Sequence, residues 1–175
     1  ELDLAALPGK LVTAYAQEEG YWHLFVALRH ARDSAFVFTT EEHTVAARFE
    51  VFPIRLAHEE GAQRAWRELG SPLLVAAAIP LWRSEWVEAA TVEPTLGSNP
   101  NTQYAGRGPS PVGAVSAARV LAGVLLEGSS GESIIIAASD SAPFNVEIAL
   151  SGEAVAKALQ SFENVSPNPS IERTN

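Results

Sequence analysis

The sequence predicts an α+β fold that is mainly antiparallel β, a meander or barrel-like sheet with a short mid-chain helix and a C-terminal helix. Three observations support this fold class. Apolar residues alternate with a period of two over much of the chain, turn-like sequences separate the alternating runs, and helical periodicity is confined to two stretches. Predicted strands therefore outnumber predicted helices by about eight to two.

The N-terminal part predicts three consecutive strands. Residues 10–17 ("KLVTAYAQ"), 21–30 ("YWHLFVALRH") and 35–40 ("AFVFTT") alternate in polarity or are rich in β-branched and aromatic residues. The short polar sequences "EEG" and "ARDS" separate them. Three strands joined in this way form a β-meander.

The middle of the chain predicts an extended stretch and then a helix. Residues 44–57 alternate in polarity as far as Pro53, which lacks the N–H that a sheet ladder needs and so marks an edge, a bulge or a bend. Residues 61–70 change to helical spacing, because Ala62, Ala65, Trp66 and Leu69 form one stripe. Residues 71–79 favour a buried strand over a short helix, and residues 81–93 show no clear preference.

The C-terminal part predicts a hairpin, a strand and a helix. Residues 115–127 suit either a strand or an Ala-rich helix. The turn sequence "EGSSGE" and the β-branched run "SIIIAAS" after it favour a β-hairpin. Residues 143–150 alternate as a strand does. Residues 151–165 predict a helix with Ser151 as its N-cap and Glu153 in its first turn.

The length of 175 residues favours one domain, which we expect to span residues 1–165. A long Gly/Pro-rich loop at 93–113 interrupts it, and residues 166–175 form a polar tail that we expect to be disordered. A chain of this size buries enough surface to form a core without a disulfide or a metal.

Composition limits the classes of function. Twelve basic and twenty-one acidic residues give a net charge of −9, which opposes nucleic-acid binding and suits a soluble protein. The absence of cysteine excludes a thiol nucleophile, cysteine-ligated zinc and iron–sulfur clusters. No apolar run reaches the length of a membrane span. We expect a cytoplasmic protein, with a secreted protein that has lost its signal peptide as the alternative.

No motif commits the chain to a catalytic chemistry. His43 and His58 have acidic neighbours and could meet across paired strands, but their spacing matches no metal-binding motif, so we expect no metal ion. Carboxylates suited to acid–base chemistry are scattered between residues 85 and 147, at Glu85, Glu88, Glu93, Asp140 and Glu147. Phosphate-binding and dinucleotide-binding glycine motifs are absent, so we expect no cofactor.

The best candidates for ligand contact lie in and before the loop. Trp82 and Trp86 share one face of a strand, as a core layer or as the wall of a pocket, and Arg83 lies between them. Arg107 is flanked by glycines and is the only cation between Arg83 and Arg119, which suits an anion contact. The predicted binding residues are Trp82, Arg83, Trp86, Asn99, Asn101, Tyr104 and Arg107.

These observations favour a protein-interaction or regulatory module, which binds a protein partner or associates with itself through an exposed β edge. One alternative is a small-ligand-binding, barrel-like protein in which the glycine-rich loop forms a lid. Another is a hydrolase that uses carboxylate or histidine chemistry. No catalytic residue can be assigned from the sequence.

Overall fold

The structure is a computed structural model that describes residues 3–18, 23–46, 49–88, 104–107, 114–140, 142 and 144–163. Its first elements are η1 (Leu4–Ala6), β1 (Leu11–Gln17), β2 (Phe25–Ala31), β3 (Ser34–Thr40), β4 (His43–Ala46), β5 (Phe49–Val51) and β6 (Ile54–Glu60). The remaining elements are β7 (Arg67–Glu88), β8 (Tyr104–Arg107), β9 (Ala114–Gly128), β10 (Ser133–Ala138), β11 (Val146–Ala149) and α1 (Gly152–Leu159). Neither helix in these ranges has the length and apolarity needed to cross a membrane.

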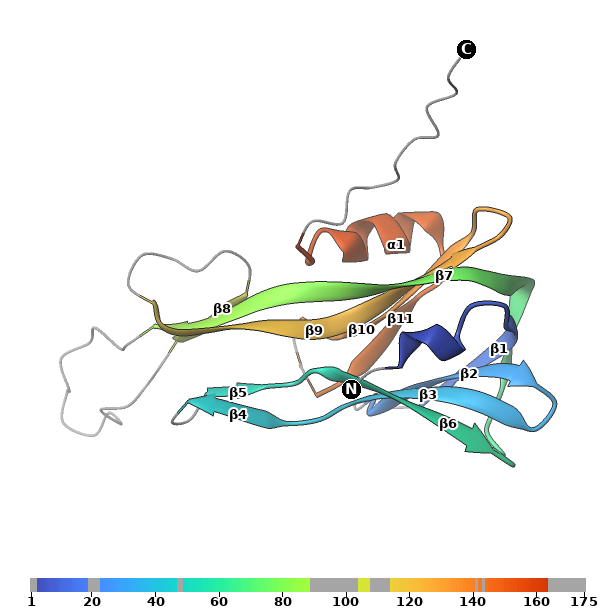
Figure 1. The fold of residues 1–175 in the computed structure, drawn as a ribbon, viewed down its shortest axis with the longest axis horizontal. Helices are drawn as coiled ribbons and strands as arrows, with labels where there is room; N and C mark the ends of the chain where they lie inside the picture. The colour runs from blue at the N-terminus through green and yellow to red at the C-terminus, as the bar shows by residue number, and fades with distance from the viewer. Residues whose placement is uncertain are drawn as a thin grey trace, which may run out of the picture.

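The main sheet is folded into two layers (Figure 1). Its strand order is β11–β10–β9–β7–β1–β2–β3–β6, every pair is antiparallel, and β8 branches from β7. We call β1, β2, β3 and β6 the meander layer, and β9, β10 and β11 with the second part of β7 the helix-covered layer. The mainly antiparallel fold is thus confirmed. The sheet does not close into a barrel, because β6 and β11 remain at its two ends.

β7 joins the two layers. Its beginning pairs with β1, and its residues from Val75 onward pair with β9. Within the β1–β7 pairing, the pairs Val12–Leu73 and Ala14–Glu68 enclose residues 69–72 of β7 but only Thr13 of β1. A bulge of this kind bends a strand, and β7 turns from one layer to the other there (Figure 1).

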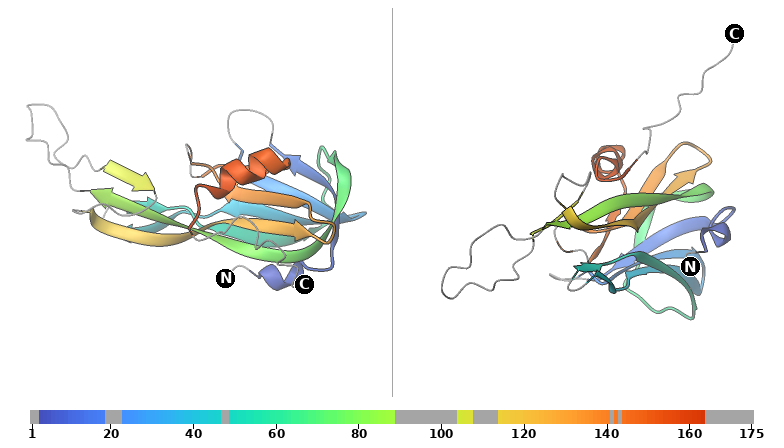
Figure 2. Two further views of the ribbon diagram at one scale, coloured as in Figure 1. Left: turned by 90° about the horizontal axis from the view of Figure 1, so that it is seen from above. Right: turned by 60° about the vertical axis from the view of Figure 1, so that its left-hand side comes forward.

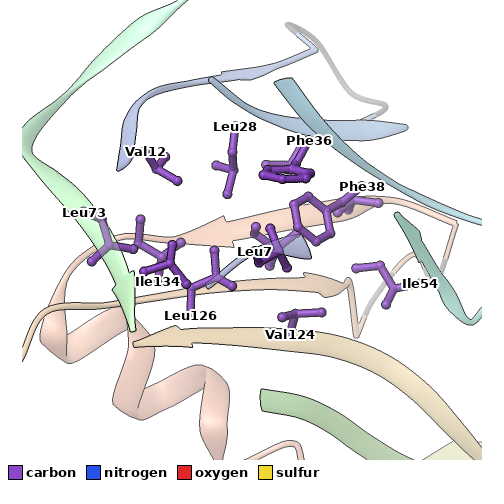
Figure 3. Packing of buried hydrophobic residues seen from close by; sticks show 14 residues of the cluster. Leu7, Val12, Leu28, Phe36, Phe38, Ile54, Leu73, Val124, Leu126 and Ile134 are labelled. Atoms are coloured by element: carbon purple, nitrogen blue, oxygen red, sulfur yellow. The ribbon is translucent and has the colours of Figure 1, made fainter. Parts of the chain in front are cut away.

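The core lies between the layers. Apolar residues that alternate along each strand face inward and form one cluster, which includes Val12, Leu28, Phe36, Phe38, Val124, Leu126 and Ile134 (Figure 3). Leu7, which follows η1, is fully buried in the same cluster. Each such side chain contributes about 1.5–3 kcal/mol of burial free energy, so this cluster holds the layers together.

α1 covers the outer face of the helix-covered layer (Figure 2). Val155 packs there against Leu81, Leu125 and Ile135. The Ser151 hydroxyl accepts a hydrogen bond from Ala154 N at 3.1 Å, so the predicted N-cap and C-terminal helix are confirmed.

Several strand predictions are confirmed. β1, β2 and β3 pair in sequence as a meander. The Ala-rich stretch is β9, and it pairs with β10 through a turn in which Gly131 has a φ of +93°. The extended stretch predicted at 44–57 is divided among β4, β5 and β6, and Pro53 lies at the break between β5 and β6.

The predicted mid-chain helix is wrong. Residues 61–66 form neither a helix nor a strand, and residues 67–70 already belong to β7. Ala62, Arg64 and Trp66 are half-buried while Gln63 and Ala65 are exposed, which is the alternation of an extended chain. A ten-residue helix bounded by glycines is marginal in isolation, and burial against the meander layer outweighs its weak helical preference.

Part of the predicted loop is also a strand. Residues 104–107 form β8, which pairs with the end of β7. The rest of the predicted loop and the predicted tail at 166–175 lie outside the described residues.

Candidate functional site

The predicted binding residues that the structure describes lie on two paired strands. They are Trp82, Arg83 and Trp86 on β7, and Tyr104 and Arg107 on β8. The β7–β8 register places Glu85 opposite Arg107 and Glu88 opposite Tyr104. Asn99 and Asn101 lie outside the described residues. The fold therefore brings the backbone of part of the predicted loop beside the strand that carries the tryptophans.

Arg83 is the largest fully buried side chain in the described part of the chain, with 1% of its surface exposed. Its Nε and Nη2 donate to Glu85 Oε1 at 3.2 and 3.0 Å, and its Nη1 donates to Asp140 Oδ1 at 2.6 Å and to the Ala138 carbonyl at 3.3 Å. A buried cation needs paired charge and hydrogen bonds to offset its loss of hydration. Both come from this chain, which accounts for Arg83 without an external ligand.

The segment after α1 is fastened onto this network. Ser161 Oγ donates to Asp140 Oδ2 at 2.7 Å, so Arg83 and Ser161 occupy different oxygens of one carboxylate. Two residues later, Glu163 N donates to the Trp82 carbonyl at 2.8 Å. Among the described strands, β7 has a neighbour on one side only at Trp82. The segment thus occupies an open stretch of the β7 edge.

Trp82 stacks with a cation of the same chain. The Arg119 guanidinium carbon lies 4.6 Å from the centre of the Trp82 ring, and Arg119 Nε donates to Glu163 Oε2 at 3.0 Å. Ser84 Oγ donates to the other oxygen of Glu163. The hydrogen bond from Ser84, followed by that from Arg119, lowers the pKa of Glu163 from its usual value. This face of β7 is therefore engaged by the segment that follows α1.

A groove runs between α1 and the strands beneath it. It encloses about 340 Å³. Its lining includes Ala137 and Ala149 from the strands and Ala154 and Ala158 from the helix, and such small side chains leave space between the two elements. Its polar lining residues are Asp140, Glu147, Lys157 and Ser161. An apolar groove of this size with a few polar groups can hold a small amphipathic molecule.

The outer face of the meander layer is partly covered by residues 61–66, which we call the crossing segment. It leads from β6 to the start of β7, and in the strand order these two strands lie on opposite sides of β1, β2 and β3. Trp66 packs against Ala16, Ala27 and Val37, one from each of β1, β2 and β3. The Arg64 guanidinium lies 4.3 Å from the Phe25 ring centre. The crossing segment thus forms a second cover, opposite the core.

The rest of this face carries an exposed apolar pair. Leu11 of β1 and Leu74 of β7 are direct cross-strand partners, and 46% and 45% of their surfaces are exposed. Cross-strand partners share a face, so the two leucines lie side by side. We call them the Leu11–Leu74 patch. A hollow of about 350 Å³ lies beside it, lined by Leu11, Thr13, Arg29, His30, Ala31 and Arg32.

Arg29 lies between the covered and uncovered parts of the face. Its Nε donates to Thr13 Oγ1 at 3.3 Å, and its Nη2 lies 2.5 Å from Glu68 Oε1. Its guanidinium carbon also lies 5.6 Å from the Trp66 ring centre. Arg29 is therefore held in place at the edge of the hollow.

The structure does not pair the strands that carry His43 and His58, because β4 pairs with β5 and β6 pairs with β3. His43 instead contacts Arg55 and Glu41. His58 Nε2 lies 3.1 Å from His30 Nε2. Burial, His58 and Lys10 lower the pKa of His30, in that order of importance. Within the described ranges, no three His, Asp or Glu side chains gather as a metal-binding group would.

Sequence reasoning missed the residues that organise these sites. Ser161 and Glu163 attach to β7 from a distant part of the chain, and no sequence pattern marks that contact. Leu11 and Leu74 each follow the alternation of their own strand, and only the β1–β7 pairing places them together. No family model, curated protein or solved structure was found to match this chain.

Proposed function

We propose that this chain is a protein-interaction module that binds a partner segment across the Leu11–Leu74 patch. The exposed cross-strand pair is the observation that carries the proposal. Leaving two neighbouring leucines about half exposed forgoes about 1 kcal/mol of burial free energy for each. Adjacent exposed apolar side chains beside a hollow are typical of binding surfaces.

The charges around the patch indicate the chemistry of the partner. Arg29 and Arg32 line the hollow, and Lys10 directly precedes Leu11. These cations are concentrated here although the whole chain has a net charge of −9. Glu68 offsets part of the charge of Arg29. We therefore propose a partner segment that carries both apolar side chains and carboxylates.

A random peptide library displayed against the immobilised full chain tests this proposal. We expect the selected peptides to combine apolar residues with Asp or Glu. Their affinity should fall about tenfold or more for the Leu11→Ser/Leu74→Ser variant, because both side chains lie at the centre of the surface. The Arg32→Glu variant should bind these acidic peptides more weakly than the wild type, because the new carboxylate repels theirs. The difference in affinity should grow as ionic strength is lowered, because less salt screens the repulsion.

The control is Leu24→Ser, which replaces a leucine with a comparable exposed fraction outside the patch. It should leave peptide affinity unchanged. The proposal is overturned if no peptide is enriched, or if enriched peptides bind the double variant as tightly as the wild type. Light scattering over a range of concentrations tests the alternative that a second copy of the chain covers the patch. In that case the wild type would dimerise as its concentration rises, and the Leu11→Ser/Leu74→Ser variant would remain a monomer.

A second candidate function is the binding of a small amphipathic ligand in the groove beneath α1. The Ala-lined groove of about 340 Å³ supports it. Ala158→Phe should fill the groove and abolish the fluorescence enhancement of an amphipathic dye such as 1,8-ANS. The Leu11→Ser/Leu74→Ser variant should retain that enhancement, which separates the two candidates. Equal dye binding by the wild type and Ala158→Phe would argue against the groove.

A further inference from the structure

Two histidines from separate strands meet at one end of the meander layer. His30 lies on β2 and His58 on β6, and their Nε2 atoms are 3.1 Å apart. Phe36 of β3 lies between them in the sheet. The His30 ring is stacked on Phe36 at 4.4 Å between ring centres, and the His58 ring meets it edge-on at 5.6 Å. These contacts orient both rings, while His58 stays exposed to solvent.

The separation of the two nitrogens matches that of two ligands on one metal ion. Imidazole nitrogen binds zinc at about 2.0–2.1 Å. Two such bonds place their nitrogens about 3.3 Å apart at a tetrahedral angle and about 2.9 Å apart at a right angle. The observed 3.1 Å lies between these values. A direct N–H···N hydrogen bond between neutral rings gives a similar distance, and the zinc titration described below distinguishes the two arrangements.

We infer that His30 and His58 form a site for one divalent transition-metal ion, zinc, nickel or copper, in which water fills the remaining coordination positions. Imidazole is the ligand these ions share, and copper binds most tightly in the usual order of affinities. His30 also lines the hollow beside the Leu11–Leu74 patch, so the metal site adjoins the proposed peptide-binding surface. The inference does not rest on that function, because neither leucine supplies a metal ligand.

A bound ion would cross-link two strands that are not neighbours in the sheet. β6 is the last strand of the sheet order, and β3 separates it from β2. An ion held by both histidines would connect β2 to β6 directly and stabilise the end strand. Lys10 opposes this, because its positive charge acts on His30. We therefore expect a moderate affinity that improves when this charge is removed.

Zinc titration of the full chain, without an affinity tag and after treatment with a chelator, tests the inference. Calorimetry should show one zinc ion per chain. Nitrogen NMR of the imidazole rings should show zinc-induced shifts at His30 and His58. His58→Gln should weaken zinc binding about tenfold or more, because it removes one of two protein ligands. This exposed substitution leaves the core intact.

The other two histidines supply matched controls. His23→Gln and His43→Gln should bind zinc as the wild type does, and Lys10→Gln should bind about twofold more tightly. The Leu11→Ser/Leu74→Ser variant should retain zinc even if it loses peptides. Absence of binding at millimolar zinc, unchanged affinity in His58→Gln, or shifts confined to His23 and His43 would each overturn the site.

Discussion

Arg83 Nη1 lies 2.6 Å from Asp140 Oδ1, and this contact joins the second half of β7 to the residues that follow β10. The two partners differ in environment. The Arg83 side chain is 1% exposed, whereas that of Asp140 is 58% exposed. The same arginine also contacts Glu85, which is buried with it. Removing the arginine and removing the aspartate should therefore have unequal effects.

We expect Arg83→Met to lower the free energy of unfolding by about 3–5 kcal/mol, because it withdraws two guanidinium donors from the buried carboxylate of Glu85. Asp140→Asn should lower it by about 1 kcal/mol or less, because an exposed partner is well hydrated. Urea denaturation measures both. Adding Glu85→Leu to Arg83→Met should recover much of the loss, and an equal effect of the two single substitutions would contradict this account.

Stability should depend on pH through Glu163. Its folded pKa is lower than its usual value of 4.5, so the ionised form is favoured by folding. This contribution is fully present above about pH 4.5 and is lost as the pH falls through the folded pKa. Wild type should therefore be more stable than Glu163→Gln at neutral pH, and the difference should close in acid. Urea denaturation of both proteins at each pH measures this difference in stability. A difference that stays constant down to pH 3 would contradict the lowered pKa of Glu163.

The crossing segment should depend on Trp66. Replacing this half-buried ring with alanine removes its packing on Ala16, Ala27 and Val37, and we expect a loss of about 2 kcal/mol. Tryptic cleavage after Arg64 should become faster, because the segment loses its attachment to the sheet. Ala65→Ser changes an exposed neighbour and should alter neither quantity. Unchanged cleavage in Trp66→Ala would contradict the described packing.

Gly128 should not tolerate a side chain. A Cβ at this position would collide with Leu73 Cδ1 and approach the Glu132 carbonyl to 3.2 Å. We expect Gly128→Ala to cost about 1–3 kcal/mol by overpacking. Gly152→Ala is the control, because a Cβ there meets nothing within 4 Å and favours the first turn of α1. Thermal unfolding of both variants tests this, and equal melting temperatures would count against it.

Most strands could be predicted because their signal is local. The alternation at β1, β2 and β3 and the turns between them specify the meander without knowledge of the rest of the chain. Ser151 likewise marks the start of α1, because a hydroxyl three residues before Ala154 caps the helix from within its own sequence.

The mid-chain helix shows where local reasoning fails. Residues 61–70 have helical spacing, but the outer face of the meander layer offers Trp66 a site to pack, and this face exists only after the strands have assembled. The candidate site was predictable only in part. Arg83 could be singled out as a polar residue between two tryptophans, whereas its partner Asp140 lies 57 residues away and is recognisable only in the fold.

The sequence by itself determined the strand-rich composition, the meander, the β9–β10 hairpin and the capped C-terminal helix, because each depends on residues that are close along the chain. Tertiary structure decided the folding of β7 across two layers, the path of the crossing segment, the pairing of Leu11 with Leu74 and the meeting of His30 with His58. These depend on contacts between distant segments. These contacts are stabilised by burial and strand pairing in the assembled sheet, and a local sequence pattern does not indicate which distant segments will meet.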